Sequence, residues 1–249
     1  MRILITGAQG HLGRKLTQEL ERDHELRLFD LHPNEDEDPR TIVGDVTVLP
    51  SVEVAMTACD AVVHLAIASG HEGEVETDAF NALRFDVNVK GTFNVLEAAR
   101  RCEVGRVVYA SSLMVVWGYG ASEFVGPNAA ARPVGTYAVT KRLGEVLCEE
   151  YVRQHGLSVV GLRIAKPIDP DDSHDVFAQQ HIIRPQWIHM ADLCRAFRLA
   201  VETVGIQFEI IHLVGESTRR RWDLSAAVRL LGYRPQHRLE DEGYRFEES

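Results

Sequence analysis

Tyr137 and Lys141 are the two side chains whose types and spacing best suit chemistry. They stand four residues apart in a segment with helical apolar spacing, so both project from one helix face. A free tyrosine has a pKa of about 10, and a neighbouring ammonium group lowers that pKa by stabilising the phenolate. Tyr137 can then act as a general base toward a hydroxyl group. The same spacing also occurs by chance on helices, so its weight depends on the elements around it.

A serine pair supplies the third polar group of this candidate site. Residues 104–110 predict a buried strand, and Ser111 and Ser112 follow it directly. Ser112, with Ser111 as the alternative, would hydrogen-bond the reacting oxygen. The helix of Tyr137 comes next along the chain. Because the carboxyl ends of parallel strands meet at one edge of a sheet, we expect the serines and the tyrosine to lie together there.

The first thirty residues predict a dinucleotide-binding βαβ unit. An apolar run over residues 1–6 leads into three glycines, a helical segment and a second apolar run that ends at Asp30. Gly7 allows a sharp turn, Gly10 lets the backbone approach a pyrophosphate, and Gly13 lets the helix pack closely on the sheet. The helix N-terminus offers free N–H groups to phosphate, and Asp30 is expected to accept hydrogen bonds from ribose hydroxyls.

Alternating apolar runs and helical patterns continue along the chain. The expected strands are residues 1–6, 25–30, 42–46, 60–66, 104–110, 157–164, 186–188 and 208–214, and the expected helices are residues 14–22, a segment that begins near residue 49, 74–102, 137–151, 190–204 and 224–231. This order predicts an α/β fold, a Rossmann-type doubly wound parallel sheet with a small C-terminal α/β cap. We expect residues 1–165 to form the NAD-binding domain and residues 166–249 to form the cap, partly interleaved with that domain.

Two long segments are expected to be loops, residues 113–133 and 166–184. A loop of this length in a compact domain is usually functional, so residues 113–133 are the main candidate for a substrate wall.

Composition and charge exclude several classes of function. The chain has 249 residues, 45% of them hydrophobic, which suits one α/β domain with a full core. No apolar run approaches the roughly 20 residues of a membrane span, and no signal peptide is expected. A net charge of -10 argues against nucleic-acid binding. The four widely spaced cysteines and the scattered histidines predict no disulfide and no metal site, and they favour a reducing, cytoplasmic location.

The surroundings of Asp30 favour NAD over NADP. Asp30 and the acidic run of residues 35–38 would repel a 2′-phosphate, and His32 and Arg40 are the only positive candidates nearby.

Several residues near the expected cofactor path have two interpretations. Asp45 either takes the adenine amino group, with Val46 against the ring, or caps the following helix. Asn88 is either an ordinary polar helix residue or projects toward the site. Gly91 in a helix costs about 1 kcal/mol against alanine, which indicates close packing. His64 is expected to be a satisfied core histidine rather than a catalyst.

A set of short motifs resembles the extended short-chain dehydrogenase/reductase family. The matching segments are Thr6–Gly13, Asp45–Val46, His64–Ala66, Asn88–Thr92, Tyr109–Ser112 and Tyr137–Lys141. The resemblance implies a Rossmann domain, a catalytic set of Ser112, Tyr137 and Lys141, and sugar or sugar-like substrates. It also implies a homodimer formed through the helices at residues 75–102 and 137–155.

The resemblance and the motifs together give a predicted site. The predicted cofactor-binding residues are Gly7, Gln9, Gly10, His11, Leu12, Gly13, Asp30, Asp45, Val46, Leu65, Ala66, Asn88, Tyr137, Lys141 and Ile164. The predicted substrate-binding residues are Ser69, Ser112, Leu113, Met114 and Lys166.

The short tail is most similar to uronate dehydrogenases and their aldose-dehydrogenase relatives, but the substrate positions depart from them. Those enzymes follow the catalytic serine with Asn-His, where this chain has Leu113 and Met114. They follow Arg-Ile with Gly-Ser, where the last position here is Lys166. Lys166, His174 and Arg184 either meet an anionic substrate group or are solvated.

These features predict an NAD-dependent dehydrogenase that removes hydride from a sugar or a related secondary alcohol. The alternative is a sugar or nucleotide-sugar epimerase or dehydratase in which NAD stays bound, although the short tail leaves little room for a nucleotide. A third class is an NAD-binding sensor, but such a protein would not need Tyr137 and Lys141.

Overall fold

The computed structural model of the chain describes residues 1–34, 38–68, 76–120, 122–173 and 175–247. Within them, seven parallel strands form the main sheet in the order β10-β6-β5-β4-β1-β2-β3. These strands are β1 (Arg2–Thr6), β2 (Glu25–Asp30), β3 (Thr41–Val43), β4 (Ala61–His64), β5 (Arg106–Ser112), β6 (Val159–Ile164) and β10 (Phe208–Leu213). The strand order changes direction between β1 and β4, the point where open α/β sheets bind ligands. The predicted doubly wound parallel sheet is confirmed.

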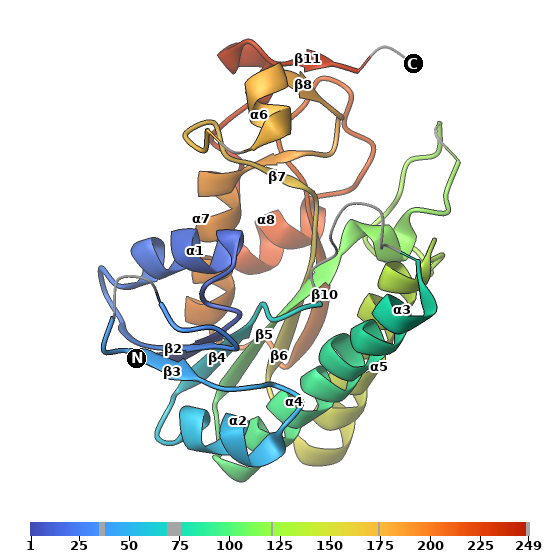
Figure 1. Cartoon of the computed structure of the whole chain (residues 1–249). Coiled ribbons are helices and arrows are strands. Elements are labelled where there is room, and N and C mark those ends of the chain that lie inside the picture. The colour runs from blue at the N-terminus through green and yellow to red at the C-terminus, as the bar shows by residue number, and fades with distance from the viewer. Residues whose placement is uncertain (35–37, 69–75, 121, 174, 248–249) are drawn as a thin grey trace.

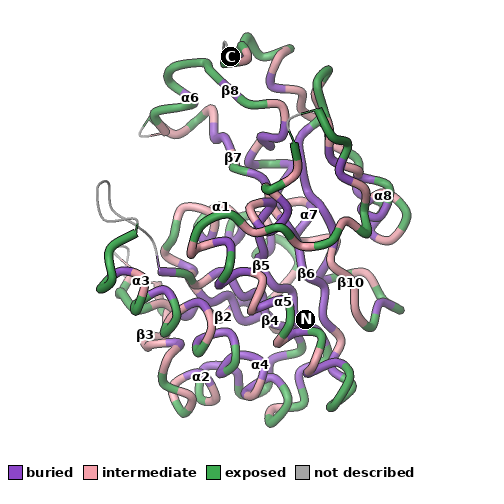
Figure 2. The backbone as a smooth tube through the Cα atoms, turned by 90° about the vertical axis from the view of Figure 1, so that its right-hand side faces the viewer, coloured by how far each residue is buried: buried purple, intermediate pink, exposed green. Residues whose placement is uncertain are grey.

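Helices cover both faces of this sheet, which gives three layers (Figure 1). One face packs against α1 (His11–Leu20), α7 (Met190–Glu202) and α8 (Ser225–Leu231), and the other against α2 (Leu49–Met56), α4 (Gly91–Arg101) and α5 (Thr136–His155). Every residue of β4 and β5 is buried, as Figure 2 shows for the centre of the molecule. Coverage of both faces explains why these strands are continuous apolar runs in the sequence.

Several element boundaries differ from the prediction, and three of these differences have a clear local reason. Helix α1 begins at His11 and not at residue 14, because the glycine turn ends at Gly10, whose extended backbone precedes the helix. Strand β3 ends at Val43 and not at residue 46, because the Asp45 carboxylate accepts a hydrogen bond from the Thr47 amide at 2.7 Å and turns the chain. Strand β5 continues through Ser112, because its pairing with β6 extends to that residue.

The predicted helix over residues 74–102 is one helical stretch with a change of winding inside it. Helix α3 (Asp78–Arg84) leads into a π-helical turn (Phe85–Lys90), and α4 follows at once. Gly91 ends the wide turn, and a Cβ atom there would lie 2.9 Å from Val46 Cγ2. The close packing predicted for Gly91 is therefore confirmed. Single π turns are rare and recur near functional sites.

The predicted loop over residues 166–184 contains regular structure, so that prediction is wrong. It holds β7 (Pro167–Ile168), α6 (Val176–Gln180) and β8 (Ile182–Ile183). Short elements of this size leave little periodicity to detect. The Asp175 carboxylate starts α6 by accepting hydrogen bonds from the Phe177 and Ala178 amides at 3.0 and 3.2 Å.

The tail contributes to two parts of the molecule. Strand β7 pairs with β9 (Ile188–His189) and β8 with β11 (Arg245–Phe246), and these pairs lie with α6 above the sheet in Figure 1. Strand β10 instead pairs with β6 and extends the main sheet. The division into residues 1–165 and 166–249 stays a prediction. Across the described residues, no helix is both long and apolar enough to cross a membrane.

Candidate active site

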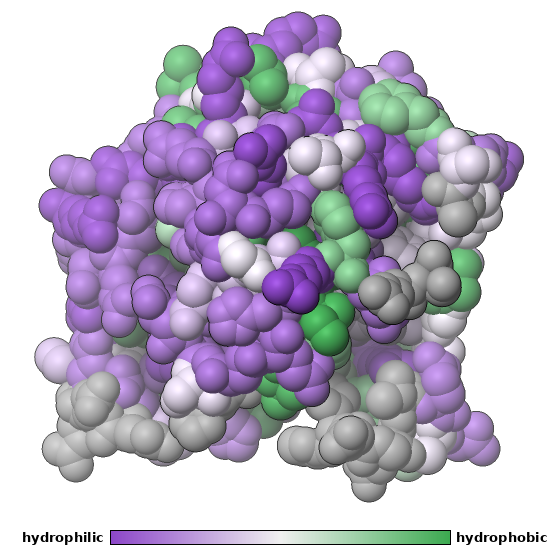
Figure 3. All heavy atoms as spheres, turned by 90° about the horizontal axis from the view of Figure 1, so that it is seen from above, coloured by the Kyte–Doolittle hydropathy of each residue, from purple (hydrophilic) through white to green (hydrophobic). Residues whose placement is uncertain are grey.

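A cavity of about 850 Å³ lies at the carboxyl ends of the strands. Its volume is toward the upper end of the range of about 300–1,000 Å³ for small-molecule sites. When the molecule is seen from above, hydrophobic side chains lie among hydrophilic ones near the middle of that face (Figure 3). The predicted site residues that line it are Gly7, Gln9, Gly10, His11, Leu12, Gly13, Asp30, Asp45, Val46, Leu65, Ala66, Ser112, Leu113, Met114, Tyr137, Lys141, Ile164 and Lys166. Residues far apart in the sequence are thus brought to one cavity, as predicted.

The glycine loop at residues 7–13 and the first turn of α1 line one end of the cavity, and we call this part of the site the cradle. Gly7 has a φ of +74°, and a Cβ atom on it would lie 2.7 Å from the Ala66 amide nitrogen. A Cβ atom on Gly13 would lie 2.3 Å from the Gly7 carbonyl oxygen. No side chain caps α1 at Gly10, and its first turn holds no acidic residue. The unpaired N–H groups of that turn therefore fit a phosphate anion, as a bound dinucleotide requires.

Asp30 is fixed at the end of β2 beside this cradle. Its Oδ2 accepts a hydrogen bond from the Gln9 amide at 2.9 Å, and its Oδ1 accepts one from the His32 amide at 3.2 Å. Arg40, one of the two positive candidates near Asp30, is already held by Asp38 and Glu21 at 2.6 and 2.9 Å. A 2′-phosphate would therefore find no unpaired guanidinium group at Arg40.

Asp45 and Asn88 both act on the backbone around the cavity. Asp45 lines the cavity and turns the chain before α2, but it does not cap that helix, whose N-cap residue is Val48 with no side-chain cap. Asn88 is buried and does not line the cavity. Its Oδ1 accepts a hydrogen bond from the Ala68 amide at 2.8 Å, and its Nδ2 donates to Thr140 Oγ1 at 3.0 Å. Asn88 therefore holds Ala68, which does line the cavity, against α5.

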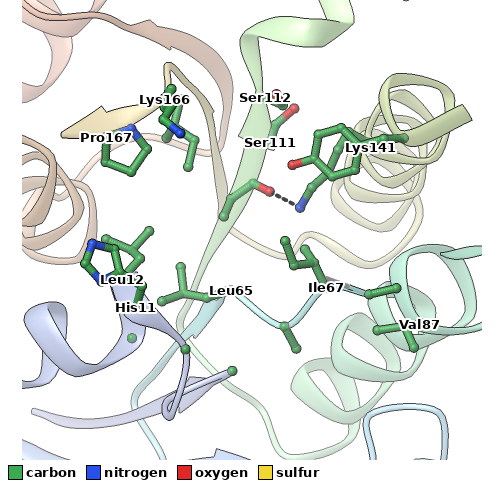
Figure 4. Close-up of a pocket in the computed structure, with 18 of the residues that line it drawn as sticks. His11, Leu12, Leu65, Ile67, Val87, Ser111, Ser112, Lys141, Lys166 and Pro167 are labelled. Carbon is green, nitrogen blue, oxygen red and sulfur yellow. Dashed lines mark hydrogen bonds between the residues drawn. The ribbon is translucent and has the colours of Figure 1, made fainter. Parts of the chain in front are cut away.

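Lys141 points into the cavity from the first half of α5 (Figure 4), and Tyr137, at the start of the same helix, lines the same cavity. The Lys141 Nζ donates to the Ala110 carbonyl oxygen at 2.6 Å and lies 5.9 Å from the centre of the Tyr137 ring. Burial lowers the pKa of Lys141 to about 7. Burial also raises the pKa of Tyr137, while a hydrogen bond with Ser112 and the charge of Arg84 act in the opposite direction. The net shift of the Tyr137 pKa is upward, so the lowered pKa that we expected is not found, because burial outweighs the charges nearby.

The two serines at the end of β5 have different partners. Ser111 Oγ donates to Glu145 Oε1 at 2.6 Å, and Glu145 forms a buried ion pair with Arg163 through contacts of 2.7 and 2.8 Å. Ser112 Oγ accepts a hydrogen bond from the Met114 amide at 3.2 Å and interacts with Tyr137. Of the two, Ser112 is the one available to a substrate oxygen.

His64 lies beneath these residues in the core. Its ring nitrogens lie 2.7 Å from Thr6 Oγ1 and 3.1 Å from Thr92 Oγ1. Burial lowers its pKa to about 3, so the ring is neutral at physiological pH. The prediction of a satisfied core histidine is confirmed.

The other end of the cavity is lined by side chains from several loops. From the segment 113–133, Leu113, Met114 and Trp117 line it, and Trp117 stacks on Trp222 at 5.7 Å between ring centres. The tail adds Lys166, Arg184, Gln186 and Trp187. Gln186 and Trp187 are not among the site residues predicted from the sequence. Their only signal is a tryptophan that follows shortly after the segment 166–184, which was expected to be a loop. Ser69 and His174 lie outside the described residues.

A group of charged side chains joins α1 to the tail. His11, Asp169 and Asp172 bring one possible ligand atom each within 4.8 Å of one another. The Lys15 ammonium lies 2.8 Å from Asp169 Oδ2 and already supplies a positive charge there. The contacts of Lys15 and His11 with the two aspartates fit a cluster of ion pairs.

Comparisons with known proteins agree with this geometry. The model of the NAD dependent epimerase/dehydratase family matches residues 3–185. L-arabinose 1-dehydrogenase (NAD(P)(+)) from Haloferax volcanii is 29% identical over 251 residues, which cover 94% of this chain and 96% of that protein. Uronate dehydrogenase from Pseudomonas putida is 29% identical over 241 residues, with 94% and 83% covered.

Solved structures of uronate dehydrogenase are also similar to this chain. The structure of uronate dehydrogenase from Agrobacterium tumefaciens has a TM-score of 0.82 and 28% identity, covering 96% of this chain and 86% of that one. A mutant of that enzyme complexed with NAD also has a TM-score of 0.82, with 27% identity and the same coverage. The chain belongs to the NAD-dependent epimerase/dehydratase family and is an NAD-dependent enzyme of the extended short-chain dehydrogenase/reductase type.

Proposed function

We propose that the chain is a dehydrogenase that oxidises a hydroxyl-bearing carbon of a sugar or sugar-like substrate. The observation that carries this proposal is the grouping of Ser112, Tyr137 and Lys141 on the wall of the cavity that also contains the glycine cradle. The two relatives named above act on an aldose and on uronates by their names, which supports a sugar as the substrate.

Each polar group has a distinct task in this reaction. When bound along the cavity, NAD would supply the acceptor for the hydride that leaves the substrate carbon. Ser112 donates a hydrogen bond to the substrate oxygen and holds it toward the ring of Tyr137. Tyr137 takes the hydroxyl proton, so that a carbonyl group forms as the hydride departs. Lys141, anchored on the Ala110 carbonyl, supplies positive charge beside the tyrosine and is placed to hold the ribose of the cofactor.

The residues around the glycine cradle indicate where each part of the cofactor would bind. We infer that the first turn of α1 binds the pyrophosphate, that Asp30 binds the adenosine ribose, and that Asp45 and Val46 border the adenine. The Arg40 guanidinium group already donates a hydrogen bond to Asp38, which supports a preference for NAD over NADP.

A second candidate is an epimerase or dehydratase that keeps NAD bound through each cycle. It is supported by a dTDP-glucose 4,6-dehydratase from Streptomyces niveus, which is 27% identical over 266 residues. The dehydrogenase is favoured by the L-arabinose 1-dehydrogenase and the uronate dehydrogenase, which are matched over 96% and 83% of their own length.

The test is to incubate the protein with NAD and a panel of aldoses, uronates and small cyclic alcohols, and to follow NADH absorbance. A dehydrogenase forms one NADH for each product molecule. Protein that purifies with bound NAD and converts a nucleotide sugar without net NADH would instead establish the second candidate.

We also infer a homodimer formed through the helices at residues 75–102 and 137–155. Phe85, Phe93, Val139 and Val146 expose apolar side chains on these adjacent helices. Val146→Glu should give a monomer by light scattering. Val54→Glu, at an exposed position on α2, is the matched control and should leave the dimer intact. A Val146→Glu protein that keeps the mass of the dimer would rule out this interface.

We place the protein in the cytoplasm, without a nucleic-acid partner. All four cysteines are free, which suits a reducing compartment. The net charge of -10 disfavours binding to phosphate backbones. Cell fractionation and a gel-shift assay with duplex DNA and RNA test the two statements.

A further inference from the structure

Lys166 occupies an unusual position at the substrate end of the cavity. It follows β6 directly, and its side chain lies across the cavity from Lys141 and the serine pair (Figure 4). The ammonium nitrogen lies 3.7 Å from the centre of the Phe177 ring and 5.5 Å from the centre of the Trp187 ring. Two aromatic rings therefore hold this cation at the wall of the site.

Aromatic rings hold a cation without neutralising it. Within the described part of the chain, no carboxylate forms an ion pair with Lys166, whereas Lys15 lies 2.8 Å from Asp169 and Arg184 lies 2.8 Å from Glu247. Among the described residues, the Lys166 ammonium group is thus a cation on the cavity wall without a carboxylate in an ion pair with it.

Asp175 is the acid whose charge acts on Lys166, and it is already in use. It caps α6 through hydrogen bonds from the Phe177 and Ala178 amides. Burial lowers the pKa of Lys166, with Asp175 acting in the opposite direction. The ammonium is thus partly removed from water and only partly compensated, a state that a bound anion would relieve.

We propose that Lys166, held by Phe177 and Trp187, selects substrates in which the sugar carries an anionic group, either a carboxylate or a phosphate. This inference rests on the proposed dehydrogenase function and names its substrate class. Lys166 departs from the Gly-Ser pattern of uronate dehydrogenases, so this means of binding the anion belongs to this chain.

The experiment compares matched sugars that differ in charge. The pairs are galactose with galacturonate, glucose with glucuronate, and glucose with glucose 6-phosphate, each assayed as kcat/KM for NADH formation. The wild-type protein should prefer the anionic member of at least one pair. The uronate pairs and the phosphate pair distinguish the two sources of the anion.

Variants of Lys166 then assign the preference to the ammonium group. Lys166→Met keeps the stem and should lower kcat/KM for the anionic sugar by on the order of 10- to 100-fold, as expected for a hydrogen bond to a charged group. The neutral sugar should lose less than the anionic sugar, because it carries no charge for the ammonium group to contact. Lys166→Arg should keep the preference, and Lys90→Met, at an exposed lysine outside the cavity, should change neither rate.

Two results separate this inference from the proposed function. Oxidation of neutral sugars with equal or higher kcat/KM would overturn the role of Lys166 and leave the dehydrogenase intact. An absence of NADH with every sugar, together with calorimetric binding of an anionic sugar that Lys166→Met removes, would overturn the reaction and leave the role of Lys166 intact. Equal losses for both sugars of a pair in Lys166→Met would also overturn the inference.

Discussion

The cofactor side of the cavity is made largely of backbone, whereas its substrate side is made of side chains. At Gly7 and Gly13 an added Cβ atom would lie within 2.7 and 2.3 Å of backbone atoms, so no other residue type fits without a shift. At the opposite end, Leu113 and Met114 come from one short helical turn, and Trp187 comes from a separate segment of the tail. On the cofactor side, the close backbone contacts restrict Gly7 and Gly13 to glycine. On the substrate side, different residue types can be accommodated, and their side chains determine the shape of the space left for the substrate.

This difference explains what each side can do. A backbone cradle binds the same phosphate groups in every reaction cycle. A wall of side chains can change by substitution while the cradle is kept, which is how one fold serves different substrates. The predictions below test that separation.

Tyr137→Phe should have the largest effect. Removal of the hydroxyl group takes away the general base, so turnover should fall by about 10²- to 10⁴-fold. NAD affinity, measured by calorimetry, should stay near the wild-type value because the cradle is untouched. Turnover close to that of the wild type would eliminate the role of Tyr137.

Ser112→Ala should have the next largest effect. Loss of one positioned donor costs about 10²- to 10³-fold in kcat. The hydrogen bond from Ser112 also opposes the upward shift of the Tyr137 pKa. Its loss should move the rise of the oxidation rate to higher pH, because the phenolate then forms only in more alkaline solution.

Ser111→Ala is the matched control for that prediction. Its hydroxyl serves Glu145 and not the cavity centre, so the pH profile of kcat should not move. A shift in Ser111→Ala with none in Ser112→Ala would reverse the assignment of the two serines.

Gly13→Ala should weaken cofactor binding for every substrate alike. The new methyl group would displace the glycine loop, and overpacking of about 1–3 kcal/mol corresponds to roughly 5- to 150-fold in NAD affinity. Gly126→Ala is the control, since nothing lies within 4 Å of a Cβ atom there. Unchanged NAD affinity in Gly13→Ala would mean that the cradle is not the cofactor site.

Met114→Ala should have the smallest effect. It enlarges the substrate side alone, so KM should change by less than about tenfold, by different factors for different sugars. NAD affinity should not move. A parallel loss of NAD affinity, measured by fluorescence titration, would show that the two sides of the cavity are not independent.

The sequence allowed prediction of those features that local geometry dictates. The glycine turn, Asp30 at the end of β2 and the Tyr137–Lys141 pair each depend on neighbours within a few residues. Their convergence follows from a general rule of parallel sheets. The sequence favoured Ser112 over Ser111, but the physical reason for that choice was not predictable, because it depends on Glu145, Arg163 and Tyr137, which come from other elements.

The remaining misses are long-range as well. Gln186 and Trp187 reach the cavity only because β9 pairs with β7. The raised pKa of Tyr137 depends on the burial of the whole pocket, which no local pattern encodes. The close approach of Val46 to Gly91 likewise joins two segments that are far apart in the sequence.

The place of β10 in the main sheet bears on how the chain is made. Strand β6 is complete once residue 164 has been synthesised, but its outer edge is paired only when Phe208–Leu213 arrive. Until then, unpaired N–H and C=O groups of a buried strand are open to other chains, a known route to aggregation. A nascent chain that stalls before residue 208 is therefore the form of this protein that would most need a chaperone.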